Sequence, residues 1–197
     1  IDHGQHHSDV ILGMVKEVLA ESGLSLKQLD AIAFSRGPGS FTSLRIGAGV
    51  AQGLAFGADL PVIPVSSLAV LAQSVDALKV LAAFDARMNQ VYWGAYVRNA
   101  KGLVESVGNE IVIAPVDVPF PEGQGWVGAG SGWDVYADLL TRKLDSCLTE
   151  WRAKVFPTSR AVATLGAAAF AAGQAVSPEQ AIPVYIRDEV AVKQKSR

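Results

Sequence analysis

The chain has 197 residues, of which 50% are hydrophobic and 18% are charged. This composition is typical of a globular protein with a full core and excludes a disordered chain. The formal net charge is −2 and the only basic cluster, residues 193–197, reads as a solvated tail, which disfavours a large autonomous nucleic-acid surface. The single cysteine, Cys147, cannot form an internal disulfide, which fits a reducing compartment.

The sequence shows no signal peptide and no membrane span. Its most apolar stretch, residues 46–58, lies between Arg45 and Asp59 and is far shorter than the roughly 20 residues that cross a bilayer. We therefore expect a cytoplasmic protein that does not enter a membrane. The first residue is Ile1 rather than Met, which leaves room for a leading segment that the sequence does not include.

The first half of the chain alternates helical and strand patterns. Residues 8–22 predict a helix, because Ser8 suits the N-cap and Gly23 is a natural stop. Its apolar stripe is wider than one buried face needs and comprises Val10, Ile11, Leu12, Met14, Val15, Val18 and Leu19. We then expect a turn at 25–30, a strand near 31–35, a glycine loop, a helix at 43–57, a strand at 62–65 and a helix at 66–75. This order predicts a parallel sheet with crossover helices.

Strand patterns dominate after Lys79. We expect strands at 80–86 and 90–98 joined by a tight turn, a third strand within 104–113, a proline-marked loop, a strand at 126–129, a helix at 133–144, a strand at 153–156 and a helix at 158–172. We interpret this half in outline as β-β-β-α-β-α-β-α, which places a further helix between the third strand and the strand at 126–129. The first half repeats this outline without the opening three strands.

The repeated outline predicts the fold class. A three-strand meander followed by α-β-α-β-α, used twice, is the layout of the α/β actin/hexokinase-like (ASKHA) two-lobed fold, in which each lobe is a mixed sheet with crossover helices. We therefore expect an N-terminal lobe, residues 1–77, that is incomplete at its start because its first β-hairpin is missing. A C-terminal lobe with a C-terminal tail follows at residues 78–197. Fold alone does not identify a function.

Two glycine-rich turns could face a ligand. Gly37, Gly39 and Ser40 lie between a predicted strand and a helix, where free backbone N–H groups and the helix dipole can hold an anion. Gly128 and Gly130 form a second turn of this kind. That turn fails the dinucleotide pattern, because a tryptophan stands at its third glycine position, and a tight strand–helix turn explains its glycines equally well.

Several motifs, in order along most of the chain, together resemble the bacterial TsaB family, also called YeaZ. They are Arg36-Gly-Pro-Gly-Ser-Phe-Thr42 with Leu44-Arg45-Ile46-Gly47, Ala51-Gln52-Gly53-Leu54-Ala55, Asp85-Ala-Arg87-Met88 with Val91-Tyr92-Trp93, and Pro183-Val-Tyr-Ile-Arg187. One departure is Ser43, where the family pattern has glycine.

This resemblance implies a role in forming threonylcarbamoyladenosine beside the tRNA anticodon. It implies a non-catalytic subunit that pairs with its catalytic relative TsaD, which would hold the metal and the nucleotide. The resemblance also implies that TsaE joins the larger complex. The chain is expected to form a homodimer when TsaD is absent and to contact tRNA only indirectly.

The residues offer little chemistry of their own. His3, His6 and His7 are the only histidines, and no distant ligand completes a metal shell around them. TsaD-like enzymes carry two histidines four residues apart where this chain has Ser67 and Leu71. We therefore expect no catalytic residues, no metal and no cofactor.

Other interpretations of the same residues stay open. Asp85 could be a catalytic carboxylate or simply a partner of Arg87. The two glycine turns could belong to an active ATP-binding ASKHA enzyme. A metallopeptidase of the glycoprotease type is a further, less favoured alternative.

The predicted helix at 43–57 contains glycines four residues apart. Each interior glycine destabilises a helix by up to about 1 kcal/mol relative to alanine, so a compensating contact is expected. Such a ridge lets another backbone approach closely, either from a partner or from within the same domain. We predict a partner interface made of Ile11, Met14, Val15, Val18, Gly49, Gly53 and Gly57.

Overall fold

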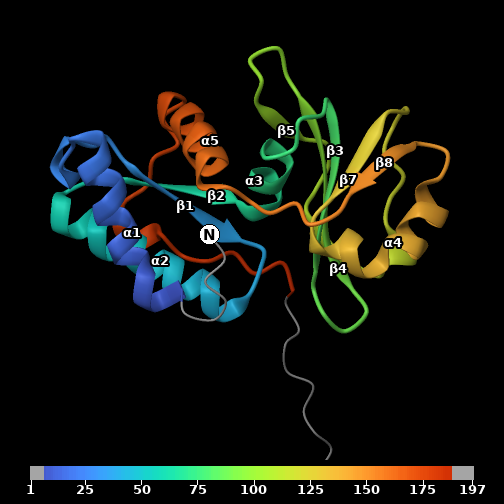
Figure 1. The fold of residues 1–197 in the computed structure, drawn as a ribbon, viewed down its shortest axis with the longest axis horizontal. Coiled ribbons are helices and arrows are strands. Elements are labelled where there is room, and N and C mark those ends of the chain that lie inside the picture. The colour runs from blue at the N-terminus through green and yellow to red at the C-terminus, as the bar shows by residue number, and fades with distance from the viewer. Residues whose placement is uncertain (1–6, 188–197) are drawn as a thin grey trace, which may run out of the picture.

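The structure, a computed structural model, describes residues 7–187 and is a mixed α/β arrangement with two sheets (Figure 1). The helices are α1 (His7–Ser22), α2 (Phe41–Ala58), α3 (Ser67–Gln73), α4 (Ser131–Leu144) and α5 (Ser159–Ala171). The strands are β1 (Ile32–Gly37), β2 (Val62–Ser66), β3 (Lys79–Asp85), β4 (Val91–Arg98), β5 (Val104–Ser106), β6 (Ile111–Ile113), β7 (Trp126–Ala129) and β8 (Leu148–Arg152). Short 3-10 turns occur at Leu26–Gln28, Pro115–Asp117 and Pro178–Gln180. Within the described residues, no helix is both long and apolar enough to cross a bilayer.

The first sheet consists of β1 and β2, which pair in parallel with Ile32 opposite Val62. Helix α2 covers one face of this sheet and buries three alanines there, because small side chains let the helix lie close to the strands. These alanines, with Phe34 and Val62, form one hydrophobic cluster: Ala48, Ala51 and Ala55. The predicted parallel pair with crossover helices is thus confirmed.

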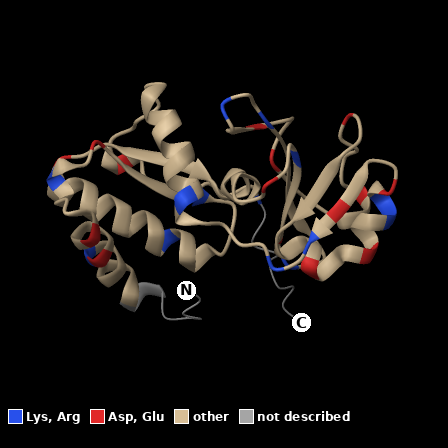
Figure 2. Ribbon diagram, turned by 45° about the horizontal axis from the view of Figure 1, so that its top comes forward, with Lys and Arg blue, Asp and Glu red and all other residues tan. Residues whose placement is uncertain are grey.

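The second sheet has the order β5-β4-β3-β7-β8, with β6 also paired to β4. Helix α4 covers one face, where three tryptophans share a core with Leu140 and Leu144. Helix α3 lies against the other face and also contacts β1 and β2, so it packs between the two sheets (Figure 1 and Figure 2). The tryptophans are Trp93, Trp126 and Trp133.

The end of the described chain returns to the first sheet. Helix α5 packs on β1 and β2, so closely that a Cβ on Gly166 would lie 2.6 Å from the Cβ of Ala33. Val176 exchanges two backbone hydrogen bonds of 2.9 Å with Val62. The strands of the first sheet end at Ser66 and those of the second begin at Lys79, whereas residues 159–184 pack on the first sheet.

Most predicted elements are present, with boundaries shifted by one or two residues. Helix α1 already includes His7, so Ser8 lies within the helix instead of capping it. Side-chain caps that the sequence did not predict occur elsewhere: Ser66 accepts two backbone N–H bonds at the start of α3, and Thr158 accepts one at the start of α5.

The structure corrects three predicted elements. The single strand expected within 104–113 is two short strands, because the segment around Gly108, with a φ of 87°, leaves β4 between them. Only a 3-10 turn, not a helix, stands between the third strand and β7. The strand expected at 153–156 is β8 at 148–152, since Lys154 adopts a φ of 55° and ends the extended backbone.

Candidate functional site

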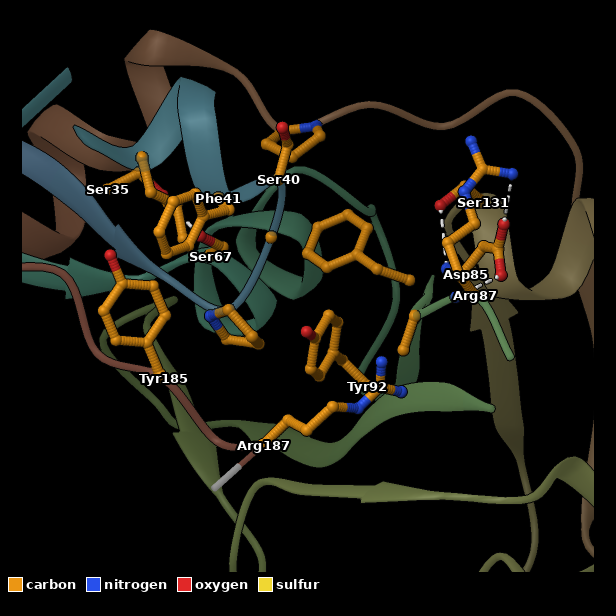
Figure 3. A pocket seen from close by; sticks show the side chains of 16 residues that line it. Ser35, Ser40, Phe41, Ser67, Asp85, Arg87, Tyr92, Ser131, Tyr185 and Arg187 are labelled. Carbon is orange, nitrogen blue, oxygen red and sulfur yellow. Dashed lines mark hydrogen bonds and ion pairs between the residues drawn. The ribbon is translucent and has the colours of Figure 1, made fainter. Parts of the chain in front are cut away.

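A cleft of about 830 Å³ lies between the two sheets (Figure 3). The first half of the chain contributes the glycine loop, the start of α2 and the start of α3. The second half contributes the β3–β4 turn, the start of α4 and the segment near Arg187. The lining side chains include Ser35, Ser40, Phe41, Ser67, Asp85, Arg87, Tyr92, Ser131, Tyr185 and Arg187.

The structure places the predicted loop of Gly37, Gly39 and Ser40 at this cleft, although Gly37 itself is the last residue of β1. Gly37 has a φ of 113°, and a Cβ there would lie 2.7 Å from the carbonyl oxygen of Val184. Ser40 is the N-cap of α2 but makes no side-chain cap hydrogen bond. Close packing of the C-terminal segment therefore explains Gly37, and Gly39 and Ser40 remain at the cleft wall.

The second glycine turn holds a tryptophan. A Cβ on Gly128 would collide with the indole of Trp133, and one on Gly130 would collide with the carbonyl oxygen of Ala83 and with Leu71. The indole Nε1 of Trp133 donates a 2.8 Å hydrogen bond to the carbonyl oxygen of Leu81. Tight strand–helix packing accounts for both glycines, which was one of the two interpretations drawn from the sequence.

The β3–β4 turn carries an ion pair. Arg87 lies 3.1 Å from the carboxylate of Asp85, which also accepts a 2.9 Å hydrogen bond from the Arg87 backbone N–H. Arg87, Met88 and Asn89 all have left-handed φ angles between 53° and 60°, so side chains project from a turn where glycines are absent. The backbone N–H of Asp85 donates to the Ser131 hydroxyl at 3.1 Å. This matches the prediction that Asp85 pairs with Arg87.

The described residues contain no group of three or more His, Cys, Asp or Glu side chains arranged for metal coordination. Ser67 donates or accepts a 2.7 Å hydrogen bond with Ser35, and Leu71 is completely buried in the core. His3 and His6 lie outside the described residues, as does the basic tail. Cys147 is buried, and this burial raises the pKa of its thiol.

Sequence reasoning missed a polar cluster that joins the two halves. The Glu110 carboxylate accepts hydrogen bonds from Ser66, at the start of α3, and from Tyr96, on β4. Burial is the largest cause that raises the pKa of Tyr96 above its ordinary value, and the negative charge of Glu110 is the next largest. The cluster links residues up to 44 positions apart, and no local pattern in the sequence marks it.

The predicted interface residues occupy two surfaces. Gly49, Gly53 and Gly57 have no atom within 4 Å of an added Cβ, apart from their own helix, so their side of α2 is open. Met14 and Val18 are exposed on α1. The alternative that the glycine ridge packs inside its own domain is therefore wrong, because α2 uses its alanines for that purpose.

The other two predicted interface residues, Ile11 and Val15, line an apolar slot of about 680 Å³. Its floor is the edge of β1 from Ala31 to Ser35, which is not paired to another strand in the described part of the chain. Helices α1 and α2 form one wall and α5 forms the other. The sequence did not predict that Ile11 and Val15 would face this slot while Met14 and Val18 lie on the exposed surface of α1.

Comparisons with known proteins agree with this architecture. A family model described as TsaD, tRNA N6-adenosine threonylcarbamoyltransferase, matches residues 2–194. The chain is 41% identical over 196 residues to the tRNA threonylcarbamoyladenosine biosynthesis protein TsaB of Escherichia coli (strain K12), covering 96% of this chain and 84% of that protein.

Two solved structures from Pseudomonas aeruginosa are similar in fold and sequence. One is a protein described as similar to peptidase YEAZ, with a TM-score of 0.84 and 41% identity over 92% of this chain and 84% of that one. The other is YeaZ, with a TM-score of 0.83 and 42% identity over the same shares. The chain therefore belongs to the TsaB family, within the wider family that the TsaD model describes.

Proposed function

We propose that the protein is a non-catalytic subunit of the cytoplasmic machinery that forms threonylcarbamoyladenosine on tRNA, and that it docks a TsaD-type transferase through α1 and α2. Its membership of the TsaB family supports the pathway, because the Escherichia coli relative is named for threonylcarbamoyladenosine biosynthesis. TsaE belongs to the proposed larger complex, and a second copy of the chain occupies the same face when the transferase is absent.

The open face of α1 and α2 is the observation that supports docking best. The glycines of α2 leave a shallow, uncovered strip, and Phe56 beside them is 57% exposed. On α1, Val18 is 64% exposed, and none of residues 10–22 is fully buried. Glycines that destabilise a helix without packing inside the domain are compensated if a partner backbone packs on them.

The interior of the cleft supports a non-catalytic role. Where TsaD-like enzymes carry two histidines, this chain has Ser67, which is hydrogen-bonded, and Leu71, which is buried. A turn whose backbone closely approaches a phosphate needs glycines. The β3–β4 turn instead carries the side chains of Arg87 and Met88. The second glycine loop is filled by the indole of Trp133.

The open slot supports the finer part of the fold assignment, the two-lobed ASKHA arrangement with a missing first hairpin. In the ladder with β2, the N–H of Ile32 donates to Pro61 at 3.0 Å, so the alternating N–H groups of Ala33 and Ser35 face the slot. A strand with apolar side chains on both faces fits there, between α1 and α2 on one side and α5 on the other. We propose that the first hairpin of an N-terminal lobe occupies this slot in the whole protein.

Replacing Gly53 with leucine tests the docking face. Gly53→Leu adds bulk where the strip is open and raises helix propensity, so the fold should stay intact while association is lost. Size-exclusion chromatography and calorimetry with the TsaD-type transferase of the same organism measure the effect. Asp138→Leu, which places a new leucine on the exposed side of α4, is the control. Equal association of both variants with the transferase contradicts the proposal.

A further inference from the structure

The mouth of the cleft carries an exposed pair of aromatic rings. Phe41, the first residue of α2, and Tyr185, on the C-terminal segment, have ring centroids 5.5 Å apart at 34°. Phe41 is 54% exposed and Tyr185 is 43% exposed. Figure 3 shows both rings on the same side of the pocket. Two neighbouring rings that remain this exposed offer a stacking surface that the fold itself does not use.

An arginine holds the two rings in place. The guanidinium carbon of Arg45 lies 3.7 Å from the centroid of the Phe41 ring. Its Nε donates a 3.1 Å hydrogen bond to the hydroxyl of Tyr185. The planar cation therefore stacks on one ring and fixes the other, so this group needs little reorganisation to receive a flat ligand.

Two more arginines, Arg87 and Arg187, line the same cleft. Arg187 donates a 2.5 Å hydrogen bond to Gln90 of the second sheet, and Arg87 is paired with Asp85 while its side chain stays 87% exposed. Among the described residues that line the cleft, Asp85 is the only carboxylate, and Arg87 already neutralises it. The mouth is therefore locally cationic although the whole chain has a net charge of −2.

We propose that this mouth binds unpaired nucleotides of RNA directly, whereas the family resemblance implies only indirect contact with tRNA. A base stacks on the Phe41–Tyr185 pair and on the Arg45 guanidinium, and the flanking phosphates contact Arg87 and Arg187. Rings and arginine planes of this kind bind bases that are free of a duplex, because only an unstacked base exposes its π-face. That the RNA is a loop of tRNA rests on the proposed function, whereas the stacking site does not.

The chemistry favours RNA over a protein partner. Tyrosine and arginine are also enriched at protein interfaces, but charged residues as a class are depleted at the core of such interfaces. Here three arginines stand against one carboxylate, Asp85, so two positive charges stay uncompensated, which complements phosphate.

Fluorescence anisotropy of the purified chain with a labelled single-stranded RNA of about ten nucleotides tests the proposal. Phe41→Ala should weaken binding at least about fivefold, the loss expected for one stacked base. Arg45→Glu and Arg87→Glu should weaken it further and reduce its dependence on salt. Arg142→Glu, the same charge change on exposed α4 outside the cleft, should leave the affinity unchanged. Circular dichroism of each variant confirms that it is folded.

Several outcomes overturn the proposal. The proposal is overturned if the cleft variants and Arg142→Glu bind the RNA with equal affinity. It is also overturned if a blunt RNA duplex binds as tightly as the single-stranded RNA. Displacement of the RNA by ATP at similar affinity would indicate a free-nucleotide site. Loss of transferase binding in Phe41→Ala with unchanged RNA affinity would indicate a protein surface. Because RNA binding is measured on the chain alone, its failure is distinguishable from failure of docking through Gly53.

Discussion

The hydroxyl of Tyr96, on β4, donates a hydrogen bond to the carboxylate of Glu110 with an O–O distance of 2.5 Å. The same carboxylate accepts from Ser66, whose oxygen also caps α3. One side chain from the segment between β5 and β6 thus ties the second sheet to the helix that packs between the sheets.

This contact leads to a prediction about alkaline stability. Because the pKa of Tyr96 is raised in the folded state, the unfolded chain loses its proton first, near pH 10, and stability falls as pH rises above that value. Tyr96→Phe should cost about 1–2 kcal/mol in the free energy of unfolding at neutral pH, since it removes a hydrogen bond to a charged group. Urea unfolding between pH 8 and about 11 should show the two proteins converging above pH 10. A constant difference across that range contradicts the assignment.

The glycine of the second turn should be structural. Gly130→Ala forces a left-handed φ of 104° on a residue whose Cβ meets backbone, so the free energy of unfolding should fall by roughly 2–5 kcal/mol. Gly102→Ala is the control, with a φ of 78° and open space around it, and should cost about 1 kcal/mol. Denaturant unfolding of both variants measures the difference. Similar losses would show that contact with Ala83 and Leu71 does not matter.

The isolated chain should not bind ATP as an enzyme does. Calorimetry with ATP and magnesium should give no saturable heat over the range of about 1 μM to 1 mM in which enzymes commonly bind their substrates. The physical reason is that Trp133 fills one glycine loop and no described side chains are arranged to coordinate a metal. Tight binding would favour the alternative of an active ATP-using enzyme.

The open edge of β1 should be visible in amide hydrogen exchange. In this chain the amide of Ala33 should exchange much faster than that of Phe34, because only the latter points into the ladder with β2. A longer version that adds the first hairpin should slow exchange at Ala33 and raise stability. Unchanged exchange at Ala33 in the longer version contradicts the proposal that a strand fills the slot.

Local patterns were enough to predict the helices and most strands. The stripe of α1, the run of α2 and the β3–β4 hairpin each depend on neighbours within a few residues, so periodicity and turn residues reveal them. The pair of Asp85 and Arg87 could be predicted for the same reason, since the two lie two positions apart. The strand expected at 153–156 failed because its apolar residues follow a turn that Lys154 sets by a backbone angle, which composition does not show.

The sequence by itself determined most of the elements, the parallel pairing of β1 with β2 and the family resemblance, because these rest on local periodicity and short motifs. Only the tertiary structure decided what the glycines do. Gly49, Gly53 and Gly57 face open space, whereas Gly130 lies against Ala83 and Leu71. The tertiary structure also places Tyr185 against Phe41 and Glu110 against Tyr96. Such contacts depend on how distant segments pack, and spacing along the chain carries no information about distances across the core.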